Sequence, residues 1–168
     1  MKVIFLDIDG VLNVELSERD AYGKLFHPHL VDNLRHIVEQ TGADIVITST
    51  WKSKGLKTLQ NMWRYRNLPG RVIDVTQYCD EVAHEQGIQY YDQITRGHEV
   101  QHWINKNPRV TNWVMIDDDL DIMPEQRSNF VRTANNKHHS DSVDIGFGLT
   151  KICAEKAIKI LNIKNGIK

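Results

Sequence analysis

The chain lacks the features that mark several common classes of protein. It has only two cysteines in 168 residues, Cys79 and Cys153, which are too few for a disulfide framework. No apolar run approaches the roughly 18–20 residues of a membrane span. The N-terminal segment turns acidic at Asp7, so we expect no signal peptide. These absences exclude collagen, coiled-coil, disulfide-rich secreted and membrane proteins, and we expect a cytoplasmic protein.

The chain also lacks an excess of charge of either sign. Its 21 basic and 22 acidic residues give a formal net charge of -1, so no global field attracts nucleic acid or an anionic membrane. Apolar residues make up 40% and charged residues 26% of the sequence, which is ordinary for a soluble globular protein. At this length one domain is the default. We therefore expect a single domain over residues 1–168, with no obligate protein partner.

Five short runs rich in β-branched and aromatic residues predict buried strands. Helical patterns with one apolar face lie between them. Alternating strands and helices imply right-handed crossovers and a three-layer, Rossmann-like α/β fold with a parallel sheet of about five strands. The predicted strands are Val3–Leu6, Ile45–Ile47, Arg71–Val75, Asn112–Ile116 and Asn129–Arg132, and the predicted helices run from Pro28 to Gly42, from Leu56 to Arg66, from His98 to Lys106 and from Thr150 to about Leu161.

Two segments do not fit this alternation. Residues 13–26 follow the first strand and predict a loop or a short hairpin. Residues 77–95 follow the third strand and predict a polar loop that carries Tyr78, Tyr90 and Tyr91. In a parallel sheet both segments lie at the edge where ligands bind.

Acidic and hydroxyl residues follow three of the predicted strands. The first strand runs into Asp7-Ile8-Asp9-Gly10-Val11-Leu12, the second into Thr48-Ser49-Thr50 and the fourth into Asp117-Asp118-Asp119. Because parallel strands end at one edge of the sheet, these groups converge there. Like charges packed together are unfavourable unless something positive lies between them. A hard divalent cation, Mg2+ above all, is therefore the expected cofactor.

The spacing within the first acidic segment suits phosphoryl transfer. Asp7 and Asp9 point to the same side of an extended chain because successive side chains alternate. Gly10 allows a sharp exit and a close backbone approach. One carboxylate can then attack phosphorus while the other exchanges a proton with the leaving group, through an aspartyl-phosphate intermediate.

Residues 7–12 resemble the first motif of the haloacid dehalogenase (HAD) superfamily of phosphatases, and the other elements follow in that superfamily's order. The resemblance runs from Met1 to about Leu161. It implies that Asp7 is the nucleophile and a metal ligand. It also implies that Asp9 is the general acid/base, with its backbone carbonyl on the metal. Asp117 would bind Mg2+, and Asp118 would bind it directly or through water.

The resemblance also assigns the hydroxyl and the remaining acidic residues. Thr48 would hydrogen-bond the transferring phosphoryl group, and Ser49 is the alternative because the end of the strand is uncertain by one residue. Asp119 and Asp121 are expected to lie past the site as solvated loop charges. Trp51, just after the second strand, is expected to pack beneath the site rather than to stack on substrate.

The basic residue departs from the superfamily, which usually has a lysine. Arg96 is the favoured candidate because it begins the helix that leads into the fourth strand, at the active edge. Lys106 lies ten residues further along that helix, or about 15 Å away. Lys52, which follows the second strand, is the competing candidate. An arginine would bind two phosphate oxygens where a lysine offers a point charge.

The inserted segments suggest the class of substrate. Neither residues 13–26 nor residues 77–95 are long enough for the cap domain of larger HAD members, and a nearly capless site suits an extended substrate. The resemblance therefore implies a nucleotide or a nucleic-acid terminal phosphate, with a phosphoprotein or a small-metabolite phosphate as alternatives. Gly10, Lys52, Tyr90 and Tyr91 are the candidate substrate contacts, since aromatic rings stack on bases, and Lys54 and Lys57 would approach a phosphate chain.

A receiver-type phospho-acceptor module is the alternative from another functional class. It too joins an aspartate, a hydroxyl residue, a lysine and an acidic pair on a parallel sheet. Receivers place the acidic pair after the first strand and the phosphorylated aspartate after the third. Here Val75-Thr76-Gln77 follows the third strand, so the order of the elements favours the phosphatase.

Overall fold

The computed structural model describes residues 1–14, 18–88, 94–134 and 146–163. Its centre is a five-stranded parallel sheet in the order β5-β4-β1-β6-β7. The predicted α/β fold with about five parallel strands is confirmed. The strands are β1 (Lys2–Leu6), β4 (Asp44–Ile47), β5 (Val72–Val75), β6 (Asn112–Asp117) and β7 (Phe130–Arg132).

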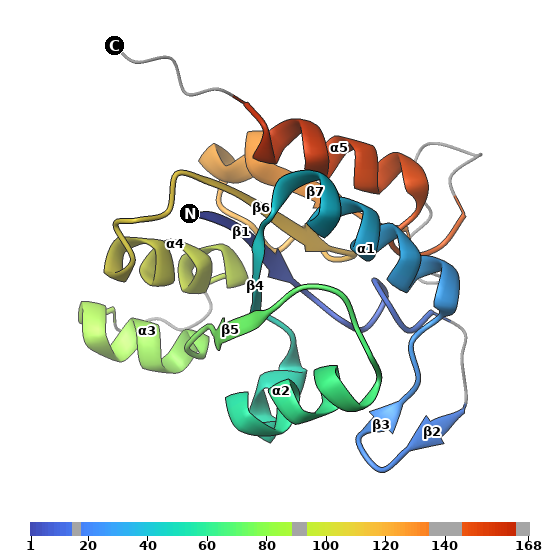
Figure 1. The fold of residues 1–168 in the computed structure, drawn as a ribbon. Helices are drawn as coiled ribbons and strands as arrows, with labels where there is room; N and C mark the ends of the chain where they lie inside the picture. The colour runs from blue at the N-terminus through green and yellow to red at the C-terminus, as the bar shows by residue number, and fades with distance from the viewer. Residues whose placement is uncertain (15–17, 89–93, 135–145, 164–168) are drawn as a thin grey trace.

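Helices cover both faces of this sheet. Figure 1 shows α1 (Pro28–Thr41) and α5 (Lys151–Leu161) on one face and α4 (Arg96–Lys106) on the other. Because side chains alternate along a strand, β1 supplies both cores. Ile4 and Leu6 join the core that includes residues of α1 and α5, and Val3 and Phe5 join the core that includes residues of α4. The four residues from Val3 to Leu6 are fully buried.

The ends of the helices follow local signals in the sequence. Pro28 opens α1, and Gly42 closes it in the left-handed conformation with φ 65°, where glycine has no steric penalty. The Thr150 side chain accepts a hydrogen bond from the Cys153 backbone N–H at the start of α5. The second predicted helix is α2 (Leu56–Tyr65), which buries Leu59, Met62 and Trp63. Among the described residues, no helix is both long and apolar enough to cross a membrane.

One prediction about residues 77–95 is wrong, because part of this segment is the helix α3 (Cys79–Gln86). The Tyr78 backbone N–H donates to the Glu81 side chain at 2.8 Å, which closes the first turn. Gly87 ends the helix with φ 67°. Only Val82 and Ala83 of this helix are buried, so its apolar stripe is too short to stand out from a polar loop. Its polar face pairs with α4, where Lys106 donates to Glu85 at 2.8 Å.

The segment before α1 contains a small antiparallel hairpin of β2 (Arg19–Asp20) and β3 (Gly23–Lys24). This is the hairpin alternative of the prediction for residues 13–26. Figure 1 shows it beside α2, away from the central sheet. Two short 3-10 helices complete the described structure, η1 (Thr50–Lys54) after β4 and η3 (Pro124–Asn129) before β7.

Candidate active site

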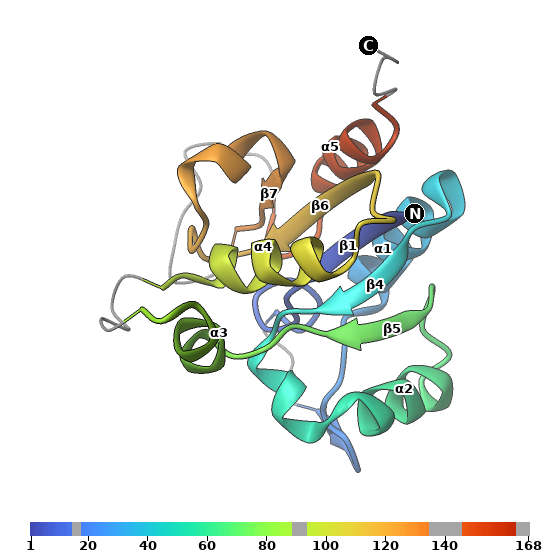
Figure 2. The same cartoon turned by 90° about the vertical axis from the view of Figure 1, so that its left-hand side faces the viewer.

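The polar residues that follow the strands lie in register at one edge of the sheet. The backbone pairing continues past each strand: Asp7 N donates to Ile116 O, and Thr48 N donates to Leu6 O, both at 3.0 Å. In Figure 2 the arrowheads of β4 and β5 point to the same side as the first residues of α4. The parallel topology therefore gathers the predicted acidic and hydroxyl residues at one edge.

Three carboxylates form the centre of the site. One carboxylate oxygen each of Asp7, Asp117 and Asp118 lie within 4.8 Å of one another, and the exposed fractions of these residues are 4%, 0% and 9%. Burial raises the pKa of Asp7 above the usual range of an aspartate, and repulsion by Asp117 adds to the shift. Burial also raises the pKa of Asp117. A cluster of this kind is favourable only with positive charge beside it.

Gly10 is needed because of Asp118. The Gly10 backbone has φ 80°, and a Cβ atom at this position would collide with the carboxylate of Asp118. Glycine adopts this conformation without strain and leaves the space open. A close approach to the Gly10 backbone was predicted, and the group that approaches it is the carboxylate of Asp118, which follows β6.

Arg96 supplies positive charge to the cluster. Its Nη1 lies 3.0 Å from Asp7 Oδ1 and 2.6 Å from Asp117 Oδ2. The Arg96 backbone N–H donates to Asp121 Oδ2 at 3.0 Å, and Gly97 N donates to Asp121 O. Asp121 lies in a loop outside the acidic cluster, as expected, but it is half-buried. It accepts hydrogen bonds at the start of α4 and so helps to hold Arg96, which was not predicted.

Lys52, the competing basic residue, contacts a different carboxylate. Its Nζ lies 2.6 Å from Glu99 Oε2, and the two side chains are 4% and 6% exposed. Lys52 also donates to Thr76 Oγ1 at 3.3 Å and to Gln77 O at 3.0 Å. The charge of Lys52 is thus neutralised by Glu99 of α4. The structure brings Arg96, and not Lys52, into ion pairs with Asp7, which follows β1, and Asp117, the last residue of β6.

Both oxygens of the Asp9 carboxylate accept hydrogen bonds. Trp51 Nε1 donates to Asp9 Oδ2 at 3.0 Å, and the Asn13 side-chain amide donates to Asp9 Oδ1. Trp51 is buried, as its expected packing role requires, but its contact with Asp9 was not predicted. Asn13 was not predicted at all. The only signal in the sequence is that each lies within a few residues of an acidic or hydroxyl segment.

The two hydroxyl residues after β4 differ in their partners. Ser49 hydrogen-bonds Asp7, which opposes the rise in the pKa of that carboxyl. Thr48 is 1% exposed, and among the described residues its Oγ1 has no hydrogen-bond partner. A buried hydroxyl without a partner is costly unless a ligand completes it. Thr48 therefore has the hydroxyl that a ligand at this edge would complete, whereas the Ser49 hydroxyl already bonds Asp7.

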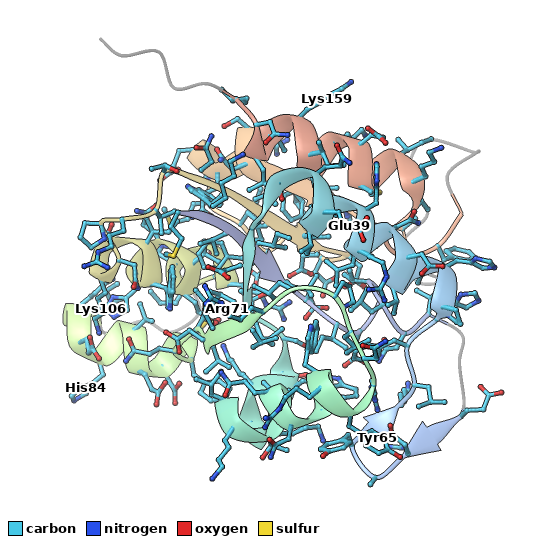
Figure 3. All side chains as sticks on the ribbon, viewed as in Figure 1. Glu39, Tyr65, Arg71, His84, Lys106 and Lys159 are labelled. Carbon is cyan, nitrogen blue, oxygen red and sulfur yellow. The ribbon has the colours of Figure 1, made fainter. Side chains whose placement is uncertain are left out.

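The remaining predicted residues lie either at the border of the site, away from it, or outside the residues that the structure describes. Asp119 donates its backbone N–H to Asp117 Oδ1 at 2.9 Å, which orients that carboxylate. Lys106 lies at the far end of α4 (Figure 3), where it pairs with Glu85. Tyr90 and Tyr91, the predicted stacking residues, lie outside the described residues.

The donor set fits a hard divalent cation. The three clustered carboxylates against the one guanidinium leave a formal charge of -2 when all are ionised. All the side-chain ligands in the cluster are oxygens, which Mg2+ prefers over softer ligands. The predicted Mg2+ ligands Asp7, Asp117 and Asp118 are thus the residues that the fold brings together.

Comparison with known proteins identifies the family of this chain. No match was found among curated proteins. Among solved structures, the chain is similar to a putative HAD superfamily (subfamily III A) hydrolase from Legionella pneumophila, with 14% sequence identity and a TM-score of 0.40 over 95% of this chain and 86% of that chain. Residues 3–138 match the protein family described as the HAD domain in Swiss Army Knife RNA repair proteins. This match spans most of the chain, and the protein therefore belongs to that family of the HAD superfamily.

Proposed function

We propose that the protein is a Mg2+-dependent phosphomonoester hydrolase that acts on the terminal phosphate of a nucleotide or a nucleic acid. The observation that carries the proposal is the buried cluster of Asp7, Asp117 and Asp118 with Arg96 beside it. The cluster combines a nucleophile, a set of oxygen ligands for a cation and a fixed positive charge. Phosphoryl transfer needs these three elements, because its catalysis is mostly positioning and charge stabilisation.

In the first half of the reaction Asp7 attacks phosphorus. A bond forms between an Asp7 carboxylate oxygen and phosphorus, and the bond from phosphorus to the leaving oxygen breaks. Asp9 gives its proton to that oxygen, so the leaving group departs as an alcohol. Trp51 and Asn13 orient Asp9 through the two hydrogen bonds that its carboxylate accepts. The product on the enzyme is an aspartyl phosphate.

In the second half of the reaction water attacks the same phosphorus. Asp9 now accepts a proton from the water, the bond between phosphorus and the Asp7 oxygen breaks, and inorganic phosphate leaves. Arg96 stabilises the negative charge of the phosphoryl oxygens in both halves, and Thr48 or Ser49 donates a hydrogen bond to one of them. Asp7, Asp117, Asp118 and the Asp9 carbonyl would hold Mg2+, which supplies further positive charge when bound.

The family supports the nucleic-acid part of the proposal. The matching family is described from RNA repair proteins, and repair of a broken strand requires removal or exchange of phosphates at its ends. An RNA end is also a large substrate, which suits the shortness of the two inserted segments, residues 13–26 and 77–95. A phosphoprotein and a small-metabolite phosphate are the alternative substrates for the same assay.

The test is phosphate release from an aryl phosphate and from RNAs with a 5'- or a 3'-terminal phosphate. Asp7→Asn removes the nucleophile with almost no change of volume, so we expect turnover to fall about 10^3-fold or more. Excess chelator should abolish activity of the wild-type protein, and added Mg2+ should restore it. Asp32→Asn on the exposed face of α1 is the matched control. Retained turnover in folded Asp7→Asn protein, or in excess chelator, would contradict this mechanism.

A further inference from the structure

A cavity of about 560 Å³ opens beside Asp9, between the β2-β3 hairpin and η1. Asp9, Gly10 and Asn13 line the end next to the acidic cluster. The other lining residues come from the hairpin and from η1, and they include three basic side chains, Arg19, Lys24 and Lys54. The cavity thus joins the proposed acid/base residue to a group of cations that the acidic cluster does not use.

The three cations are available to a ligand. All three residues are exposed, and in residues 1–14, 18–88, 94–134 and 146–163 none of them forms an ion pair with a carboxylate. Among the described lining residues, Asp9 is the one acidic side chain. Lys54 lies over the Trp51 ring, with its Nζ 5.1 Å from the ring centroid. The outer part of the cavity is therefore positively charged.

The hairpin is fastened to the body of the protein, so its cations have a defined position. Arg66, the residue after α2, donates to both carboxylate oxygens of Asp20 at 2.9 and 2.6 Å and to Gly23 O at 3.2 Å. This bidentate pair lowers the pKa of Asp20 to about 2, so both partners are charged at neutral pH. A Cβ atom at Gly23 would lie 3.2 Å from the Trp51 ring, which shows how closely the hairpin packs on that ring. Figure 3 shows Tyr65 of α2 beside the hairpin, where its ring lies 5.6 Å from that of Tyr22.

The direction of the reaction places the leaving group on this side of the site. A general acid must reach the oxygen that departs from phosphorus. In the proposed function that acid is Asp9, so the part of the substrate beyond the scissile bond lies on the Asp9 side. The cavity opens on this side, whereas Arg96 contacts Asp7 and Asp117. The cations of the hairpin and η1 would therefore meet the leaving group and not the transferred phosphate.

From this juxtaposition we infer that the cavity binds a second phosphate of the substrate, carried by the leaving group and held by Arg19, Lys24 and Lys54. The inference rests on the proposed function and deepens it, because it requires a substrate with at least two phosphates. Lysine and arginine are the side chains that bind phosphate, and arginine can bind two of its oxygens at once. A phosphodiester next to the terminal phosphate of a nucleic acid meets this requirement, and so does a nucleoside bisphosphate.

The experiment compares substrates with one and with two or more phosphates. The probes are an aryl phosphate, a nucleoside 3',5'-bisphosphate and short RNAs with a 5'- or 3'-terminal phosphate. The triple variant Arg19→Ala/Lys24→Ala/Lys54→Ala removes the cations. Exposed charge pairs contribute about threefold each, so we expect kcat/KM for the RNA to fall about 30-fold more than kcat/KM for the aryl phosphate. If kcat/KM of the triple variant falls for the RNA but not for the bisphosphate, the cavity binds a phosphate only as part of a polynucleotide chain, which supports the inference for nucleic-acid substrates.

A matched control removes the same amount of charge elsewhere. The variant Lys151→Ala/Lys156→Ala/Lys159→Ala changes three exposed lysines of α5, of which Lys159 points away from the sheet in Figure 3. We expect this control to keep the wild-type ratio of the two kcat/KM values. Equal losses for RNA and aryl phosphate in the cavity variant, or the same selective loss in the α5 variant, would overturn the inference.

Affinity separates a failure of the inference from a failure of the proposed function. The cavity and α5 substitutions are each combined with Asp7→Asn, and binding of the phosphorylated RNA is measured without turnover. We expect weaker binding only with the cavity substitutions. A wild-type protein that hydrolyses none of the probes would contradict the proposed function, and unchanged RNA binding in the cavity variant would contradict the inference alone.

Discussion

Arg96 and Lys52 are two cations at the same edge of the sheet, and they contact different carboxylates. Arg96 pairs with Asp7 and Asp117, and its side chain is 19% exposed. Lys52 pairs with Glu99, and both of these side chains are almost fully buried. A buried cation that is paired with a buried carboxylate holds elements of the fold together. A partly exposed cation beside the acidic cluster can also contact a substrate. The partner of a charge, and not only its distance from the strand end, thus indicates its role.

The comparison also shows how the two pairs are connected. Glu99 lies one turn after Arg96 on α4, and its carboxylate also accepts hydrogen bonds from Thr76 Oγ1 at 2.9 Å and from Cys79 Sγ at 3.2 Å. Lys52 therefore ties η1 to α4 and to the chain that follows β5. We expect this pair to support the position of Arg96 without acting on the substrate.

The largest effect should come from Arg96→Ala. Removing a charge that stabilises the transition state costs about 10^2- to 10^3-fold in kcat. We therefore expect turnover of an aryl phosphate to fall by this amount, and Arg96→Lys to recover part of it because the point charge returns. The measurement is steady-state kinetics at saturating Mg2+.

Lys106→Ala on the same helix is the control for Arg96→Ala. Its ammonium group contacts Glu85 and Gln77 at the exposed end of α4, so we expect wild-type turnover. Comparable losses in both variants would show that the helix as a whole, and not the Arg96 guanidinium, matters for catalysis.

A smaller effect on turnover and a large effect on stability should come from Lys52→Met. The substitution leaves the Glu99 carboxylate buried without its cation, which typically destabilises a protein by about 3–5 kcal/mol. In the double variant Lys52→Met/Glu99→Leu both charges are gone, so we expect most of the free energy of unfolding to return. Denaturant unfolding of the single and double variants measures both values. A double variant as unstable as the single one would contradict the structural role of the pair.

The sequence was sufficient to predict the features that depend on periodic patterns of apolar residues or on parallel strand topology. Alternating apolar runs and helical patterns predicted the five strands of the sheet. The end of each strand then predicted which residues meet: Asp7, Thr48 and Asp117 lie at the ends of neighbouring strands, and parallel strands end at the same edge. The choice of Arg96 over Lys106 needed only the direction of a helix.

The partners of individual side chains could not be predicted in this way. Lys52 and Glu99 are 47 residues apart, and Trp51 and Asp9 are 42 apart, with no periodic pattern to connect them. The hairpin cations Arg19 and Lys24 were missed for the same reason, because packing on Trp51 and the Asp20–Arg66 pair bring the hairpin to the site. Such contacts depend on how loops fold over the sheet edge, which local sequence does not specify.

The smallest expected effect comes from Trp51→Phe, which separates a positioning role of Trp51 from mere packing. The substitution keeps most of the ring and removes the N–H that donates to Asp9. A single hydrogen bond of this kind contributes about 1 kcal/mol, or about fivefold in rate. The loss should be larger for an alkyl phosphate than for an aryl phosphate, because a poor leaving group depends more on the proton from Asp9. Trp63→Phe is the matched control, since the Trp63 indole donates to Pro69 O at 2.8 Å in the core. If Trp51 only packs, Trp51→Phe should lower turnover of both substrates by the same factor, as Trp63→Phe would if it lowers turnover at all.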